Sequence, residues 1–311
     1  MSNKHFIELI LLAAIWGASF IFMRSATPEF GPIMLMTLRT GIAAIVLLPF
    51  LLRAKLQSQL KIYWRPILFV GLSNTAIPFC LFSYSTLYLG AGYASVLNAT
   101  APMFGAVVGF IWLKDNLPYI SVFGLCIGFL GVFVLSLARK AGFEDASLLP
   151  VCAALLATFL YGVAACYTKT YLQGISPLVI ATGSQCFAVM CLAPLSLFFW
   201  PTQMPSAQGW LQVTILGLVC TAFAYILYFR LISNVGATKA ITVAYLVPVF
   251  GVLWGILFLH ESLTPLMWAG SALVLTGVAM TTGFFTKQLN NFNDREPRPP
   301  SGERSAQRKN Y

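Results

Sequence analysis

Charged residues are scarce in this chain of 311 residues: they make up 9% of it, whereas 59% of its residues are hydrophobic. A soluble domain usually carries roughly a quarter charged residues, so the composition indicates that lipid surrounds most of the chain. The mean hydropathy of +0.81 agrees with this. The net charge of +10 does not indicate a nucleic-acid partner, because the Lys and Arg residues lie in short loops and in the C-terminal segment.

Residues arranged for proton transfer, metal binding, nucleotide binding or catalysis are also few. None of the nine acidic residues is expected at mid-membrane, and only Glu8, near the inner end of the first span, is expected within the membrane core, so a buried carboxylate proton relay is not evident. The histidines His5 and His260 are far apart, the seven cysteines lie in apolar segments without the spacing of metal ligands, and no P-loop motif is present. We therefore expect no metal, no cofactor and no enzymatic activity, since a membrane enzyme would need clustered nucleophiles, acids or ligands.

Ten segments are long and apolar enough to span a bilayer, which requires about 20 predominantly apolar residues. Turn-forming residues such as Pro28, Gly31, Gly90 and Gly92 connect them. The sequence therefore predicts an all-α integral membrane protein whose spans are residues 6–23, 32–52, 67–88, 93–113, 118–137, 148–168, 177–200, 210–232, 239–259 and 264–284.

The positive charges are divided unequally between the two sides of the membrane. With the N-terminus inside, the outer side receives only Arg24, Arg139 and Lys140, while Arg39 lies within a span and the others fall inside. Positive charge favours the cytoplasmic side, so we expect a multi-pass protein of the bacterial inner membrane with both termini in the cytoplasm.

The two end segments of the sequence have distinct compositions. The first span resembles a signal peptide in its basic start and apolar stretch, but Trp16-Gly17 has a counterpart in the second half, so we expect the segment to be retained. Residues 285–311 are polar and rich in Pro and Arg, which predicts a disordered cytoplasmic tail.

The two halves of the chain are related by an internal repeat. An offset of 145 positions aligns the early residues and an offset of 146 the later ones, with one extra residue between Pro194 and Gly217. The aligned pairs include Gly17 and Gly162, Pro32 and Pro177, Arg24 and Lys169, Thr75 and Thr221, Gly90 and Gly236, Pro102 and Pro248, Asp115 and Glu261, and Gly124 and Gly270. Each half holds five spans, so the second enters the membrane from the opposite side. Such an inverted repeat is common in secondary transporters, whose sites lie near the midplane.

Two prolines mark the expected position of that site. Pro102 and Pro248 lie near the middle of the fourth and ninth spans, where each deprives a carbonyl four residues earlier of its donor. Freed carbonyls within a bilayer must be buried in protein or face water, so Asn98 and Tyr245 beside them are candidate substrate-binding residues. The alternative is that both prolines are packing kinks.

Glycines follow each of these prolines at an interval that favours close helix packing. Gly105 and Gly109 in the first half, and Gly251 and Gly255 in the second, are four residues apart and share a helix face. Such pairs let a neighbouring backbone approach, so we interpret them as packing surfaces and not as substrate contacts.

Arg39 is the unusual charge, because it lies about 10 Å into its span at 1.5 Å per residue. Its side chain either reaches the outer interface or faces a wet cavity and attracts an anionic group such as a substrate carboxylate. Its repeat partner is Ser184, so the charge belongs to one half only. Trp16 and Tyr161, at equivalent positions of the two halves, are further candidates for the cavity, although both positions also suit the interfacial aromatic belt. Asn74 is a candidate because Pro78 frees its backbone carbonyl. The remaining candidates are Tyr84, Gln185 and Tyr225.

Together these residues resemble the EamA-type members of the drug/metabolite transporter superfamily. The resemblance rests on Trp16-Gly17, the segment from Pro32 to Arg39, GAGYASVLNATAPMFGAVVG at 90–109 and the long segment at 235–278. It implies two five-helix copies, at residues 6–137 and 148–284, around a central cavity, and often the export of amino acids or other small metabolites. Lys114-Asp115 departs from the Gly-Glu pair of many relatives.

The resulting expectation is a secondary transporter, an exporter, that moves a small metabolite such as an amino acid by alternating access. A multidrug or toxic-compound efflux carrier is the alternative, followed by a channel or a non-transporting scaffold. The expected partners are a small-molecule substrate and the lipid bilayer, with no nucleic acid. The substrate, the direction of transport, the coupling ion and the oligomeric state are left open by the sequence.

Overall fold

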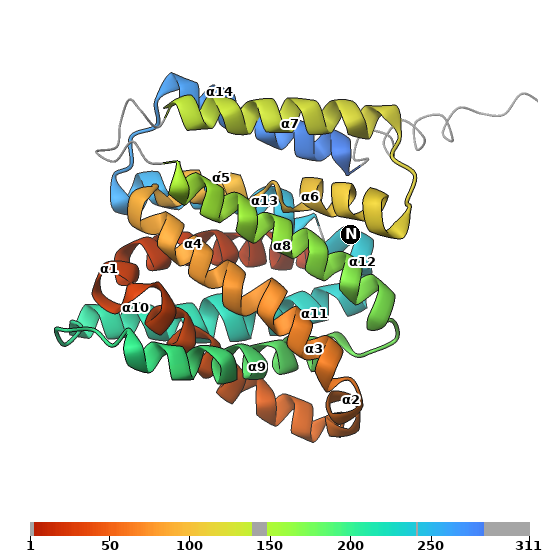
Figure 1. The fold of residues 1–311 in the computed structure, drawn as a ribbon, viewed down its shortest axis with the longest axis vertical. Coiled ribbons are helices and arrows are strands. Elements are labelled where there is room, and N and C mark those ends of the chain that lie inside the picture. The colour runs from red at the N-terminus through yellow and green to blue at the C-terminus, as the bar shows by residue number, and fades with distance from the viewer. Residues whose placement is uncertain (1–2, 139–147, 241, 283–311) are drawn as a thin grey trace, which may run out of the picture.

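The computed structural model describes residues 3–138, 148–240 and 242–282, and every regular element in these ranges is a helix (Figure 1). Three of the elements are short π-helical segments, labelled η: η1 and η4 lie inside longer helices, and η2 ends one. In chain order the elements are α1 (Asn3–Arg53), α2 (Gln57–Ile62), α3 (Trp64–Gly71), η1 (Leu72–Ala76), α4 (Ile77–Tyr88), α5 (Ala91–Asn98), α6 (Ala101–Val108), η2 (Gly109–Leu113), α7 (Tyr119–Ala138), α8 (Leu149–Tyr171), α9 (Pro177–Phe198), α10 (Ala207–Gly217), η4 (Leu218–Phe223), α11 (Ala224–Val235), α12 (Ala237–Ala240), α13 (Val243–Leu259) and α14 (Pro265–Thr281).

The 51-residue α1 consists of two helices that meet at Gly31, whose φ of 71° and ψ of 160° are not helical. Only glycine adopts such angles readily. Pro32 follows at once, and its fixed φ suits the first position of a helix. The chain therefore turns at the point where the sequence predicted a connection between two spans.

Seven helical stretches in the described part of the chain are long and apolar enough to cross a membrane. Adjoining α and η segments count as one stretch, and so do α5, α6 and η2 across the break between Asn98 and Ala101. The helices α13 and α14 are also apolar but shorter, with 17 residues each. The predicted all-α, multi-pass membrane protein is therefore confirmed. The predicted tail at residues 285–311, and Arg139 with Lys140, lie outside the described residues.

The helix bundle is built around α1, which packs against α4, α9, α10 and α13. The helices α7 and α14 lie side by side along one edge of the bundle (Figure 1). Most of the buried apolar side chains form one continuous cluster that draws on helices from both halves of the chain. Since lipid is as apolar as leucine, close packing of backbones and small residues contributes much of the association between such helices.

Pro78, Pro102 and Pro248, the three prolines expected to free a carbonyl within a span, lie in different local backbone structures. α5 ends at Asn98 and α6 begins at Ala101, so the fourth predicted span is interrupted just before Pro102. Pro248 instead lies inside the continuous helix α13. Pro78 lies in the first turn of α4, directly after the π-helical segment η1. A π-helical segment widens the helix and exposes backbone groups, so the helix is irregular at the depth of Asn74.

The predicted packing glycines lie at close contacts. A Cβ built on Gly17 would be 2.8 Å from the backbone nitrogen of Gly251, and one built on Gly162 would be 2.7 Å from that of Gly105. Gly109 instead faces the Asp115 carboxylate, and Gly255 faces both Glu261 and the backbone of Gly92.

Candidate functional site

A cavity of about 410 Å³ lies inside the bundle between helices of both halves. Segments α1, η1, α4, α5, α6, α8, η4, α11 and α13 contribute to its wall. The lining residues include six aromatic side chains, two asparagines and one arginine: Trp16, Phe20, Phe79, Phe82, Tyr161, Tyr225, Asn74, Asn98 and Arg39. The cavity thus combines a mainly apolar surface with a few polar groups, as small-molecule sites do.

Most of the predicted site residues meet in this cavity. Trp16, Arg39, Asn74, Asn98, Tyr161 and Tyr225 line it, together with Pro102. These residues come from segments far apart in the sequence, and the repeat relates Trp16 to Tyr161. The structure therefore brings these polar and aromatic candidates together in one cavity, including Trp16 and Tyr161, whose positions also suited the interfacial aromatic belt.

Three predicted substrate-binding residues lie elsewhere than in the lining. Tyr84 packs its ring against Tyr88, with 5.2 Å between centroids. The Tyr245 hydroxyl forms a hydrogen bond with the Thr282 hydroxyl. Gln185 on α9 is fully buried, and neither atom of its amide has a hydrogen-bond partner in the described part of the chain. Pro78 and Pro248 are also outside the set of residues that form the cavity wall.

Arg39 is buried, with 6% of its surface exposed, and its guanidinium contacts neutral groups. Nε donates a hydrogen bond of 2.9 Å to the hydroxyl of Thr221, and Nη1 lies 3.7 Å from the sulfur of Met23. The guanidinium carbon lies 4.0 Å from the centre of the Phe79 ring, a cation–π distance. These contacts hold the side chain at the wall of the cavity.

Within the described residues, Arg39 has no ion-pair partner. The ion pairs there join Glu8 to His5 and Arg230, and Asp115 to Lys169. A charge buried without a counter-ion costs several kcal/mol in a low-dielectric environment. An anion entering the cavity would offset part of that cost, so the geometry favours binding of an anionic group.

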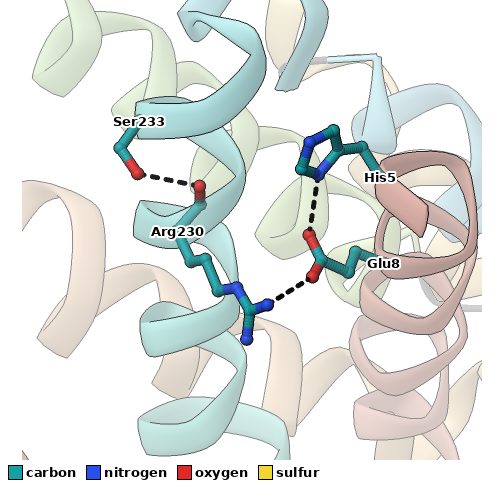
Figure 2. Close-up of polar contacts among 4 residues, drawn as sticks. All are labelled: His5, Glu8, Arg230 and Ser233. Atoms are coloured by element: carbon teal, nitrogen blue, oxygen red, sulfur yellow. Dashed lines mark hydrogen bonds and ion pairs between the residues drawn. The ribbon is translucent and has the colours of Figure 1, made fainter. Parts of the chain in front are cut away.

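Glu8, the acidic residue predicted nearest to a span, is engaged away from the cavity. Its carboxylate accepts from the Arg230 guanidinium at 3.1 Å and lies 3.3 Å from the His5 ring (Figure 2). Figure 2 shows that these contacts connect α1 with α11. Glu8 is therefore a structural ion-pair partner between two helices.

The aromatic walls of the cavity are held by ring contacts. Trp16 contacts Tyr225 edge-on, with 6.4 Å between ring centroids, and Tyr228 at 5.2 Å. Tyr161 stacks on Phe82 at 6.1 Å. Such ring pairs contribute about 0.5–1.5 kcal/mol beyond their burial, so the walls are defined before any solute enters.

Sequence reasoning did not identify Thr221 and Phe79, the closest partners of Arg39, as site residues. Thr221 lies in the π-helical segment η4, and the equivalent segment of the first half is η1. Both begin at a leucine, Leu72 and Leu218, which are 146 positions apart. The repeat alignment of Thr75 with Thr221 was the available signal, but it did not reveal which threonine faces the cavity.

The comparisons with known proteins agree with this architecture. The EamA-like transporter family matches two segments, residues 5–137 and 148–283. The chain belongs to the EamA-like transporter family. This confirms the resemblance inferred from the sequence motifs, and it makes transport the general function of the chain.

Several relatives match most of the chain. An uncharacterized transporter of Archaeoglobus fulgidus is 27% identical over 88% of this chain and 97% of its own length. A probable amino-acid metabolite efflux pump of Escherichia coli is 24% identical over 89% of this chain and 94% of its own length. One solved crystal structure, at 18% identity, has a TM-score of 0.66 and covers 93% of this chain and 99% of that chain, which supports the fold alone.

Proposed function

We propose that this EamA-like protein is a secondary transporter that moves small metabolites bearing a carboxylate, such as amino acids, by alternating access. The observation that carries the proposal is the position of Arg39: a buried guanidinium with neutral neighbours at the wall of the central cavity. Guanidinium groups bind carboxylates through paired, charge-assisted hydrogen bonds. Trp16, Tyr161 and Tyr225 would then contact the apolar part of the solute, and Asn74 and Asn98 its other polar groups.

The proposed architecture is ten spans arranged as an inverted five-plus-five repeat. Gly31 divides α1 into two spans, and α13 and α14, with 17 residues each, meet the lower end of the length that a span requires. Two equivalent contacts between the halves support the inverted repeat. Gly17 of the first half packs on Gly251 of the second, and their repeat equivalents, Gly162 of the second half and Gly105 of the first, pack on each other. Each half thus uses the same pair of positions against the other half.

The proposed placement is the bacterial inner membrane, with the two repeats at residues 6–137 and 148–284 and both termini in the cytoplasm. The distribution of Lys and Arg supports this orientation. Export is the proposed direction, and the relative in Escherichia coli named as a probable efflux pump supports it.

Efflux of drugs or other toxic compounds is the second candidate function. The six aromatic side chains in the cavity wall support it, because an apolar cavity accepts many lipophilic solutes. The two candidates differ in their dependence on Arg39. Carboxylate transport requires its charge, whereas efflux of neutral or cationic drugs does not.

The test is solute counterflow in proteoliposomes that contain the full-length protein. Vesicles preloaded with an unlabelled carboxylate metabolite should accumulate the labelled form transiently, and uptake should saturate. Arg39→Ala should lower this uptake by about tenfold or more, while the purified protein keeps its helical content. Unsaturable flux would indicate a channel, and absence of flux for all carboxylates and drugs tested would contradict transport.

A further inference from the structure

The charge balance of the cavity points to a narrower substrate class than the family name does. Arg39 is the one charged residue in the cavity wall, as far as the chain is described. The remaining lining residues are aromatic, aliphatic, amide, hydroxyl or thiol side chains. The cavity therefore holds a fixed positive charge without a fixed negative one.

An amino acid carries two charges, and the cavity matches only one of them. Its carboxylate would meet Arg39, but its ammonium group would enter a region without a carboxylate partner. Transfer of an unpaired ammonium out of water is costly, and the guanidinium would repel it. The neutral contacts of Arg39 with Thr221, Met23 and Phe79 do not change this balance.

We propose that the cavity selects carboxylates that carry no ammonium group, such as 2-oxo acids or N-acylated amino acids with an apolar or aromatic body. This inference rests on the proposed transport function and refines its substrate. The aromatic walls formed by Trp16, Tyr161 and Tyr225 contact the body of the solute, and the single guanidinium holds its one charge.

The test is competition in the counterflow assay among three solutes with the same phenyl body. Phenylpyruvate carries only the carboxylate, phenylalanine carries both charges, and phenethylamine carries only the ammonium group. We expect phenylpyruvate to compete at a concentration about tenfold lower than phenylalanine, and phenethylamine not to compete. Arg39→Gln should remove the discrimination between the acid and the amine, while the exposed Arg53 of the same helix offers a matched control in Arg53→Gln.

The outcomes separate the two levels of the proposal. Competition by phenylalanine equal to or better than that by phenylpyruvate would overturn the selectivity but leave transport intact. Absence of saturable counterflow for every solute would contradict both. If Arg39→Gln does not fold, Arg39→Lys retains the charge and should retain the preference for the acid.

A second observation concerns the C-terminal ends of η2 and α13. Lys114 and His260, 146 positions apart, both adopt the left-handed conformation, with φ of 55° and 53°. The following residues, Asp115 and Glu261, each donate a backbone hydrogen bond to a glycine carbonyl six residues earlier, at 3.2 and 3.1 Å. The two halves thus present one carboxylate each in the same local geometry.

These two carboxylates make different contacts. Glu261 accepts hydrogen bonds from the backbone amides of Ala91 at 2.6 Å and Gly92 at 3.0 Å, at the start of α5. A Cβ on Gly90 would lie 2.8 Å from the Glu261 carboxyl carbon, so glycine is needed there. Arg24 completes this end of the bundle by donating a 2.7 Å hydrogen bond to the carbonyl of Thr86.

Asp115, by contrast, is not docked on the opposite half in the equivalent way. Its carboxylate is half-exposed and pairs at 2.9 Å with Lys169, which is the repeat counterpart of Arg24. The counterpart of Gly90 is Gly236, with φ of 83°. The structure is therefore asymmetric at just those positions where the two halves could exchange contacts.

The geometry points to Glu261 and Asp115 as positioning residues. Each closes one end of the bundle, Glu261 the end that contains Gly90 and Asp115 the end that contains Gly236, and each does so in a different access state. In the state observed, Glu261 joins the halves at the end that contains Gly90 through two backbone hydrogen bonds, whereas Asp115 joins them at the other end only through its half-exposed ion pair with Lys169. In the opposite state, Glu261 releases the amides of α5, and Asp115 leaves Lys169 and moves toward the loop at Gly236. Each carboxylate would thus stabilise one of the two access states.

Hydrogen exchange of the full-length protein tests this relation. Glu261→Gln should speed exchange at residues 90–94 by about tenfold, because charge-assisted hydrogen bonds are lost. It should also slow exchange at residues 236–240 as the opposite state gains population. A merely structural cap would give the first change without the second.

Asp115→Asn is the reciprocal variant. It should leave exchange at residues 90–94 unchanged or slower, and should reduce counterflow because the opposite state loses its support. Unaltered exchange at residues 236–240 in Glu261→Gln, or wild-type counterflow in Asp115→Asn, would overturn the proposal. If Glu261→Gln fails to fold, Glu261→Asp, with a shorter reach to the same amides, provides the same readout.

Discussion

Gly162 lies so close to Gly105 that a Cβ atom on the former would be 2.7 Å from the backbone nitrogen of the latter. The contact joins α8 to α6 beside the cavity, and both glycines line it. Because the nearest atoms belong to backbone, a side chain at Gly162 can be accommodated only if the helices separate. This packing sets the width of the cavity at the level of Pro102.

Gly162→Val should therefore destabilise the protein by about 1–3 kcal/mol, the usual cost of overpacking a close contact. Thermal unfolding in detergent measures the effect. Gly41→Ala is the matched control, since a Cβ there meets only Val189 at an ordinary 3.5 Å. A Gly162→Val variant as stable as the Gly41→Ala variant would show that the helices are not in contact at this point.

Arg39→Ala should lower the kcat/KM of transport by about tenfold or more, because a charge-assisted contact worth about 1.5–3 kcal/mol is removed. Folding should be preserved, since the present contacts of Arg39 are with neutral groups. Initial rates of counterflow provide the measurement, with Arg53→Ala as the control. Wild-type rates in Arg39→Ala would remove the residue from the mechanism.

Gln185→Leu should raise stability by about 1 kcal/mol or leave it unchanged. The amide is fully buried without a hydrogen-bond partner among the described residues, and an unsatisfied buried polar group costs about 1–3 kcal/mol. Transport should continue, since Gln185 is absent from the cavity wall. A large loss of transport at normal stability would restore the sequence-based prediction that Gln185 contacts substrate.

The Glu8–Arg230 ion pair should contribute little to stability because the Arg230 side chain is 53% exposed. A double-mutant cycle with Glu8→Gln and Arg230→Gln should give a coupling energy below about 1 kcal/mol. Thermal melts of the four proteins in detergent provide it, and raised salt should weaken it further. A coupling of several kcal/mol would mean that this end of the bundle is far less solvated than the structure indicates.

The sequence predicted the helical segments well because the length of an apolar run is a direct physical requirement of the bilayer. It also predicted the break at Pro102 and the turn at Gly31, since both follow from backbone chemistry. The π-helical segments η1 and η4 were not predicted, because no local residue pattern requires the wider turn.

Only part of the candidate site could be predicted, because the sequence indicates the position of a residue along a helix better than the direction in which its side chain points. The repeat and the prolines indicate depth in the membrane, and they drew attention to Asn74 and Asn98, which line the cavity. They do not indicate which side of a helix faces inward. A helix that is apolar on all sides has no periodic polar face to define its rotation, so Gln185 and Tyr245 were placed at a suitable depth but lie outside the cavity wall.

The solitary positive charge at Arg39 has a consequence for energetics across a polarised membrane. If the protein exports monoanions as proposed, a bound monoanion neutralises the cavity and each completed outward cycle transfers one negative charge. With the cell interior negative, the electric field favours that transfer by about 2.3 kcal/mol per 100 mV. Expulsion of an anion would then proceed against a gradient of about fiftyfold per 100 mV without a coupled proton or sodium ion.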